Sequence, residues 1–283
     1  MRYKFMRFPD GKAKAVTFSY DDGCRADIRF SQTITKYGLR CTFNICSGHI
    51  GNGHNLSADE IREHIIDKGH EIAVHGEFHR APGCQTAIDG IKDVLNCRLG
   101  LEKTFGRIVR GMAYPDTGIT RMHNGASYES IKHYLTDLGI VYSRTLNGDN
   151  NLFMLPDDWH AWLPSVKHTN SKIMEYIDQF LSINLDGVYC ASRYPRLFYM
   201  WGHSYEFDND NNWEQLEQIC EKLSGHEDIW YATNIQIYDY VKAYDSLVFS
   251  ADGETVYNPT LIKVWFDVDG KLYSVDSGAT IHI

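Results

Sequence analysis

Residues 15–27 read AVTFSYDDGCRAD, an apolar run that ends abruptly in two adjacent carboxylates, Asp21 and Asp22, followed by a glycine. The run predicts a β-strand with both acids at its carboxyl end, where α/β folds place their chemistry. Two neighbouring acids repel each other, so a fold that keeps both usually gives one to a cation and leaves the other as a free base. A solvated Asp-Gly turn is the alternative interpretation of the same residues.

A second apolar run, EIAV at residues 71–74, leads into HGEFH at residues 75–79. His75 and His79 have the spacing of a metal-ligand pair, although two histidines four residues apart are more often surface residues when they stand alone. The sequence is not the H-E-x-x-H of zincins, because Gly76 stands where the glutamate would be, so a metallopeptidase loses its main support. Together with Asp-Asp-Gly, the pair favours a metal site over a solvated turn.

The composition is that of an ordinary globular protein: 283 residues, 43% hydrophobic and 23% charged. The net charge of −9 works against attraction to nucleic acid or anionic membranes, so neither is expected as a partner and the substrate is expected to be neutral or cationic. Aromatic side chains make up 13% of the chain and could form a platform for flat sugar faces, although aromatic residues are mostly core.

No stretch of the chain reads as a membrane span or as a secretory signal. The seven cysteines are odd in number and include no C-x-x-C pair, which disfavours a disulfide framework or a structural zinc knot. We therefore expect a cytoplasmic protein with reduced thiols, unless a leader has been removed from an exported form.

Apolar β-like runs alternate with amphipathic segments from residue 14 onward, which predicts βα units around a mainly parallel sheet. About seven such units favour a distorted (β/α) barrel over a doubly wound sheet, since no G-x-G-x-x-G follows the first strand. A barrel gathers its strand ends at one rim. The expected strands are 14–20, 40–46, 71–75, 107–113, 140–144, 197–202 and 229–234, and the expected helices are 28–38, 57–69, 127–139 and 211–225.

Two segments depart from this pattern. Residues 145–170 are long, polar and aromatic without a clear period, so they are expected to be either a functional loop or a plain surface excursion. After about residue 246, alternation and D-G turns predict short antiparallel strands. The expected organisation is a barrel over residues 1–245 and a small β appendage, residues 246–283, packed on it.

These residues resemble, in order and character, the polysaccharide deacetylase family, also called carbohydrate esterase family 4 or NodB-homology domain. Ser19-Tyr20-Asp21-Asp22-Gly23 is similar to the family's Thr-Phe-Asp-Asp-Gly, and residues 75–79 are similar to its His-Ser/Thr-x-x-His, with glycine in the Ser/Thr place. The resemblance implies that Asp22, His75 and His79 bind one divalent metal and that Asp21 is the base. Two imidazoles and a carboxylate leave open positions on the metal, as a catalytic site requires.

The third and fourth family motifs are matched poorly. Alignment on Pro115 puts Ala113 in the place of the family arginine, and Arg110 is expected to face solvent or an interface. The strand of the fourth motif offers Arg144 instead of an aspartate, and this arginine could replace the missing one by pairing with Asp21. A backbone amide near Tyr114 is a candidate oxyanion donor.

The fifth motif, Leu-x-His, is resembled by Trp201-Gly202-His203, so His203 is implied as the general acid that protonates a leaving amine. Only Asp157-Asp158-Trp159 is similar to the Asp-Trp of the fourth motif. The aromatic residues of these motifs, Tyr114, Trp159 and Trp201, are expected to contact the substrate.

The resemblance implies metal-dependent hydrolysis of the N-acetyl amide of a sugar, with zinc as the expected metal and cobalt, nickel or iron fitting the same ligands. Two alternatives stay open. The enzyme could act on another linear amide or a cyclic imide, because this chain departs from the family's third and fourth motifs at positions expected to contact the substrate. The chain could also be an inactive carbohydrate-binding relative, against which the presence of Asp21 and His203 argues.

Overall fold

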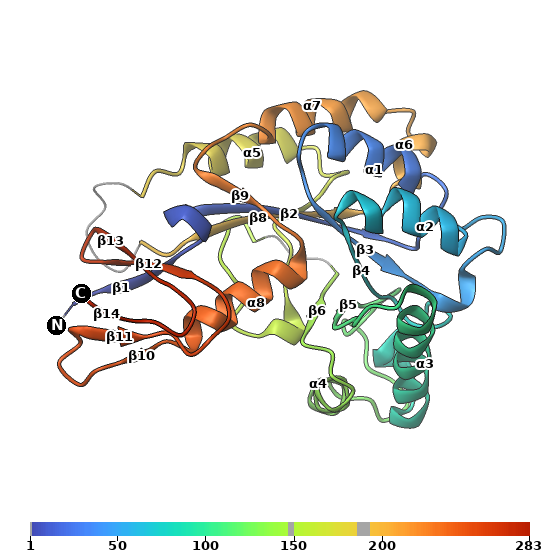
Figure 1. The fold of residues 1–283 in the computed structure, drawn as a ribbon. Coiled ribbons are helices and arrows are strands. Elements are labelled where there is room, and N and C mark those ends of the chain that lie inside the picture. Colours follow the sequence, from blue (N-terminus) through green and yellow to red (C-terminus); the bar gives the residue numbers. More distant parts are fainter. Residues whose placement is uncertain (1, 147–149, 186–192) are drawn as a thin grey trace.

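The computed structural model describes residues 2–146, 150–185 and 193–283. Its centre is a curled parallel sheet in the order β6-β5-β4-β3-β2-β8-β7, with β9 also paired to β2 (Figure 1). The predicted mixed α/β barrel with small antiparallel sheets is confirmed. The strands are β2 (Lys14–Asp21), β3 (Cys41–Ile45), β4 (Glu71–Val74), β5 (Gly111–Ala113), β6 (Tyr142–Arg144), β7 (Val166–Lys167), β8 (Arg196–Gly202) and β9 (Ile229–Tyr231).

Strand β2 is buried along its whole length and lies in the middle of the sheet. One edge pairs with β8, while the other pairs with β9 at Lys14–Val16 and with β3 at Phe18–Asp21. Because all these pairings are parallel, the carboxyl ends of β2, β3 and β8 lie at the same end of the sheet. The register places Asp21 opposite Asn44.

The second half of the segment predicted as a long loop, residues 145–170, closes the barrel. The amide of Trp162 donates to the Ser143 carbonyl of β6 at 3.1 Å, and the amide of His168 donates to the Trp201 carbonyl of β8 at 3.0 Å. Residues 162–168, which include the edge strand β7, therefore link β6 to β8 by backbone hydrogen bonds. Neither of the two expected roles for residues 145–170 included this bridge, and residues 147–149 lie outside the described part of the chain.

Helices cover the outside of the sheet, and neighbouring ones pack in the order α5-α7-α1-α2-α3-α4 (Figure 1). The four predicted helices correspond to α1, α2, α4 and α7, and Ser57 and Glu60 form a reciprocal capping box at the start of α2. The long helix α3 was not predicted, and neither were α5, α6 and α8. The helices are α1 (Asp27–Lys36), α2 (Ala58–His64), α3 (Ala87–Phe105), α4 (Tyr128–Asp137), α5 (Ile173–Ser182), α6 (Tyr205–Asn209), α7 (Trp213–Leu223) and α8 (Asn234–Asp245). Within the described residues, no helix is both long and apolar enough to span a membrane.

Two small antiparallel sheets occupy the end of the molecule where the termini meet (Figure 1). One contains β10 (Val248–Phe249), β11 (Thr255–Tyr257) and β14 (Thr280–His282); the other contains β1 (Lys4–Arg7), β12 (Val264–Val268) and β13 (Lys271–Val275). The expected C-terminal strands are present, and an N-terminal strand joins them. The division into residues 1–245 and 246–283 stays a prediction.

Candidate functional site

The candidate site lies at the carboxyl ends of β2 and β4. Asp21 is the last residue of β2, and the amide of Asp22 continues the strand pairing by donating to the Asn44 carbonyl at 3.0 Å. His75 directly follows β4. Asp22 and His79 have left-handed φ angles of 82° and 58°, which is uncommon for residues with a side chain and is typical of functional turns.

The side chains of Asp22, His75 and His79 converge on one point. Nε2 of His75 lies 3.5 Å and Nε2 of His79 lies 3.4 Å from Oδ1 of Asp22, and the three potential ligand atoms lie within 4.8 Å of one another. Two imidazole nitrogens and one carboxylate oxygen are the donor set of many catalytic zinc sites. The structure thus brings together all three residues predicted as metal ligands.

His75 is held in the tautomer that a metal ligand needs. Its Nδ1 lies 2.9 Å from the Ala113 carbonyl, so Nδ1 carries the proton and Nε2 presents its lone pair to Asp22 and His79. That Nε2 is buried and has no hydrogen-bond partner among the residues that the structure describes. Burial lowers the pKa of His75, although Asp21 and Asp22 partly oppose it, so the ring is neutral. A divalent cation would satisfy the orphaned nitrogen, and these residues therefore fit a metal.

Asp21 is buried and held by two donors. Nη2 of Arg144 lies 2.5 Å from Oδ2 of Asp21, and Nδ2 of Asn44 donates to Oδ1 at 2.8 Å. Burial alone would raise the pKa of Asp21, but the charge of Arg144, with His75 and His203, lowers it below its ordinary value. Asp21 is therefore an ionised carboxylate beside the side chains of Asp22, His75 and His79. The guanidinium of Arg144 is itself fully buried, 4.5 Å from the centre of the Trp201 ring.

His203 faces the two acids from the end of β8. Its Nε2 lies 3.9 Å from Oδ2 of Asp21 and 3.9 Å from Oδ2 of Asp22, while its Nδ1 lies 3.4 Å from Oε2 of Glu206. Burial alone would lower the pKa of His203, but Glu206, Asp21 and Asp22 raise it above its ordinary value. This ring can therefore carry a proton on the side that faces the acids.

Glu206 was not predicted from the sequence, and it connects His203 to the surrounding structure. The ammonium of Lys167 lies 2.5 Å from Oε1 of Glu206, and Nε2 of His168 lies 3.5 Å from Oε2. Despite partial burial, the contacts to His203 and Lys167 lower the pKa of Glu206 to about 2. Gly202 leaves space for the ring of His168, because a Cβ at position 202 would lie 2.0 Å from Nδ1 of His168.

The aromatic residues expected to bind substrate lie in three different environments. Trp201 is nearly buried and covers Arg144 at the site. Tyr114 is fully buried, and its hydroxyl donates to the His160 carbonyl at 2.9 Å. The rings of Trp159 and Tyr238 of α8 lie 5.0 Å apart. These contacts give no support to a substrate contact for Tyr114 or Trp159, and the role of Trp201 stays a prediction.

The third motif led to two further expectations, an oxyanion donor at the amide near Tyr114 and a non-catalytic Arg110. The amide of Tyr114 donates to the Arg144 carbonyl at 3.0 Å, so it is used in strand pairing and is not free to bind an oxyanion. Arg110 pairs with Asp239 of α8 at 2.6 Å, in keeping with the non-catalytic role expected of it.

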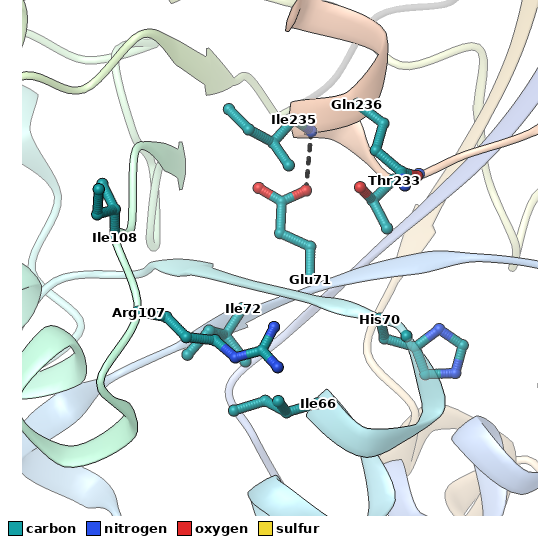
Figure 2. Close-up of a pocket in the computed structure, with 10 residues that line it drawn as sticks. Ile66, His70, Glu71, Ile72, Arg107, Ile108, Thr233, Ile235 and Gln236 are labelled. Carbon is teal, nitrogen blue, oxygen red and sulfur yellow. Dashed lines mark hydrogen bonds between the residues drawn. The ribbon is translucent and has the colours of Figure 1, made fainter.

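A separate cavity of about 230 Å³ lies at the opposite end of the barrel, where β4 begins (Figure 2). Its central acid, Glu71, accepts hydrogen bonds from the Ile235 amide at 2.9 Å, from Thr42 at 2.7 Å and from Tyr142 at 2.7 Å. Burial raises the pKa of Glu71 to about 7. The carboxylate thus holds the start of α8, and this cavity is separate from the side chains of Asp22, His75 and His79.

Comparisons with known proteins agree with the fold and the motifs. The sequence pattern of the family described as Polysaccharide deacetylase matches residues 9–131. A search of curated proteins gave no match. A Mycobacterium smegmatis protein assigned as a polysaccharide deacetylase superposes with a TM-score of 0.58 and 18% identity, over 87% of this chain and 96% of its own.

Two other structures are similar at lower scores. A family 4 acetyl xylan esterase from Clostridium thermocellum, solved with a cobalt ion, has a TM-score of 0.50 and 15% identity over 80% of this chain and 90% of its own. A mutant of BA3943, a Bacillus anthracis pseudoenzyme of carbohydrate esterase family 4 with restored activity, has a TM-score of 0.50 and 12% identity over 82% and 69%. The chain is thus similar to the polysaccharide deacetylases, in the sequence of residues 9–131 and in the fold of the whole barrel.

Proposed function

We propose that this protein is a metal-dependent hydrolase that removes N-acetyl groups from an N-acetylated sugar. The observation that carries the proposal is the convergence of Asp22, His75 and His79, where the buried Nε2 of His75 has no hydrogen-bond partner within the described part of the chain. The proposed base, Asp21, and the proposed acid, His203, lie beside this group. The family's sequence pattern matches residues 9–131, which include all of these residues except His203. The partner implied is an acetylated carbohydrate.

Asp22, His75 and His79 would hold one divalent metal, for which zinc is our first choice and cobalt, nickel or iron the alternatives. The acetyl xylan esterase with the similar fold was solved with a cobalt ion. A metal held there would polarise the acetyl carbonyl and make a water molecule more acidic. The remaining chemistry belongs to the side chains of this chain.

Asp21 is the proposed base, because it is ionised, lies next to the three ligands and is fixed by Arg144 and Asn44. It takes the proton of the attacking water. His203 is the proposed acid: its Nε2 faces the same acids, and their charges, with that of Glu206, raise its pKa and so favour the protonated ring that donates to the leaving amine. The two acids at the end of β2 thus have separate tasks.

The first prediction concerns Arg144. Arg144→Lys keeps the positive charge but loses both the planar fork and the contact with the Trp201 ring. We expect turnover to fall on the order of tenfold or more with little change in KM, because the role of the arginine is to orient Asp21. Steady-state kinetics checks this, and thermal unfolding controls for stability, since this ion pair is buried. A KM effect without a kcat effect would make Arg144 a substrate-reading residue instead.

The second prediction concerns Glu206. Glu206→Gln removes a negative charge that raises the pKa of His203. An acid must be protonated to work, so activity falls as pH rises through its pKa, and a lower pKa moves the alkaline limb of the kcat/KM profile to lower pH. We expect kcat/KM at neutral pH to fall about 10- to 100-fold, as for loss of a charged hydrogen bond.

The matched control is Glu214→Gln, which removes the same charge from an exposed position near the start of α7. The pH profile of this variant should match that of the unaltered protein. An unshifted alkaline limb in Glu206→Gln would contradict the link between Glu206 and His203.

Action on another amide or a cyclic imide is the runner-up within enzymes. Two positions favour it: Ala113 stands where the family has an arginine, and Arg144 stands where the family has an aspartate. The position of Arg144 beside Asp21 supports a role for the arginine in deacetylation as well. An inactive carbohydrate-binding relative is the alternative from another class, and one of the structures with a similar fold is a mutant of a pseudoenzyme of carbohydrate esterase family 4.

One experiment separates these functions. The metal-loaded protein is assayed for acetate release from a series of N-acetylated sugars and for ring opening of cyclic imides. Release of acetate, abolished by a chelator, supports the proposal. Ring opening without acetate release would replace it with the imide reaction, and binding of the sugars without either reaction would favour the inactive relative.

A further inference from the structure

We propose that Asp93, on helix α3, fixes the metal ligand His79 by holding the backbone of residues 76–79 in place. The inference rests on the proposed metal site and assigns a positioning role to a residue outside all the family motifs quoted above. It also explains why the second motif carries glycine at position 76.

Asp93 is buried and binds two successive amides of that loop. Its Oδ1 accepts hydrogen bonds from the amides of Glu77 at 3.1 Å and Phe78 at 3.2 Å. A carboxylate that accepts two amide donors forms charge-assisted hydrogen bonds, which are stronger than neutral ones. The loop between the two histidines is therefore tied to α3 at its centre.

The other carboxylate oxygen of Asp93 accounts for Gly76. A Cβ at position 76 would lie 2.5 Å from Oδ2 of Asp93, closer than carbon and oxygen can approach. The φ angle of Gly76 is also 75°, in the left-handed region that glycine adopts most easily. The space that a side chain would fill is thus occupied by the carboxylate of Asp93.

His79 depends on this loop more than His75 does. The ring of His75 is buried and fixed by the Ala113 carbonyl. The side chain of His79 is 34% exposed, and among the described residues its ring makes no other ion pair or aromatic contact than those with Asp22, at 3.4 Å, and with the ring of His75, at 5.0 Å between centroids. Its position must therefore come from its backbone. The amide of Gly48 restrains the loop from the other side, by a bond of 2.9 Å to the Glu77 carbonyl.

The test measures metal affinity directly, by competition with a chromophoric chelator for zinc. Asp93→Ala removes both amide bonds, and we expect its zinc affinity to fall about 10- to 100-fold, as when outer partners of a ligand are lost. Asp93→Asn keeps an oxygen acceptor for the same amides and should stay within a few-fold of the unaltered protein. The visible spectrum of the cobalt-loaded protein should change in the alanine variant and not in the asparagine variant.

Asn96→Ala is the matched control. Asn96 lies on the same helix and donates to the same loop, but to the side chain of Glu77, at 2.8 Å, and not to its backbone. Its removal should leave zinc affinity unchanged. An equal loss of affinity in Asn96→Ala and Asp93→Ala would overturn the specific role of the two amide bonds.

Gly76→Ala gives a second test in case Asp93→Ala does not fold, because its Cβ would displace the carboxylate without removing it. Zinc affinity should fall in this variant. Unchanged affinity in Gly76→Ala, or in a folded Asp93→Ala protein, would overturn the inference. Absence of zinc binding by the unaltered protein would instead contradict the proposed function, so the two failures are distinguishable.

Discussion

Asp21→Asn is expected to keep the metal and to lose turnover by roughly 10²–10⁴-fold, the usual contribution of a positioned general base. The amide cannot accept the proton of the water, yet it keeps the size of the carboxylate. The side chain lies outside the Asp22, His75 and His79 group, whose ligand atoms are therefore unchanged. Metal content and kcat, measured on the same preparation, check this prediction.

Asp22→Asn is the matched comparison, because it makes the same chemical change one residue along the chain. This variant loses the carboxylate whose Oδ1 lies 3.4–3.5 Å from both histidine nitrogens, so its metal content should fall together with activity. Equal metal loss in the two asparagine variants would contradict the division of tasks between the acids.

The Asp21→Asn variant needs a control for stability, because its neutral amide removes the negative charge that pairs with the buried Arg144. Thermal unfolding should therefore accompany its assay.

His79→Ala has the second large expected effect, the loss of stoichiometric metal and of activity with the fold retained. Two remaining ligands hold zinc much less tightly than three. The fold should persist because the side chain is partly exposed and lies on a loop. Elemental analysis of the dialysed protein measures the metal, and circular dichroism checks the fold.

The control for this variant is His133→Ala, which removes an exposed histidine from α4. It should bind as much metal as the unaltered protein. Full metal occupancy in His79→Ala would show that His79 is not a ligand, and the assignment of the second motif would then be wrong.

The sequence predicted the centre of the barrel well because local signals and the final register agree there. An apolar run followed by Asp-Asp-Gly specifies a strand and its end, and parallel pairing brings that end to the same edge as His75 and His203. The capping box of Ser57 and Glu60 fixed the start of α2 correctly, since capping is a local interaction.

Helix α3 was missed for a reason that the structure shows. Gly90 and Gly100 interrupt its pattern, and glycine is a poor helix former. In the folded protein both positions lie in close contacts: a Cβ at 90 would lie 2.6 Å from the Tyr134 hydroxyl, and one at 100 would lie 3.1 Å from Cβ of Ser47. These contacts are tertiary, and no window of sequence contains them.

Side-chain partners across the barrel were the least predictable part of the site. Arg144 and Asp21 are far apart in sequence, and their contact depends on how the sheet curls. Tyr114 and Trp159 occur in motif-like positions, yet packing turns them toward His160 and Tyr238. Of these side-chain partners, Glu206 is the one that a local sequence signal could have indicated. It stands three residues after His203, which is the spacing of neighbours on one helical turn.

The measurement that tests the central claim most directly is anomalous diffraction from crystals grown with zinc, recorded above and below the zinc absorption edge. The proposed site predicts one anomalous peak per chain, about 2.0–2.2 Å from Oδ1 of Asp22 and from the Nε2 atoms of His75 and His79. A peak at other residues, or none at saturating zinc, would contradict the account.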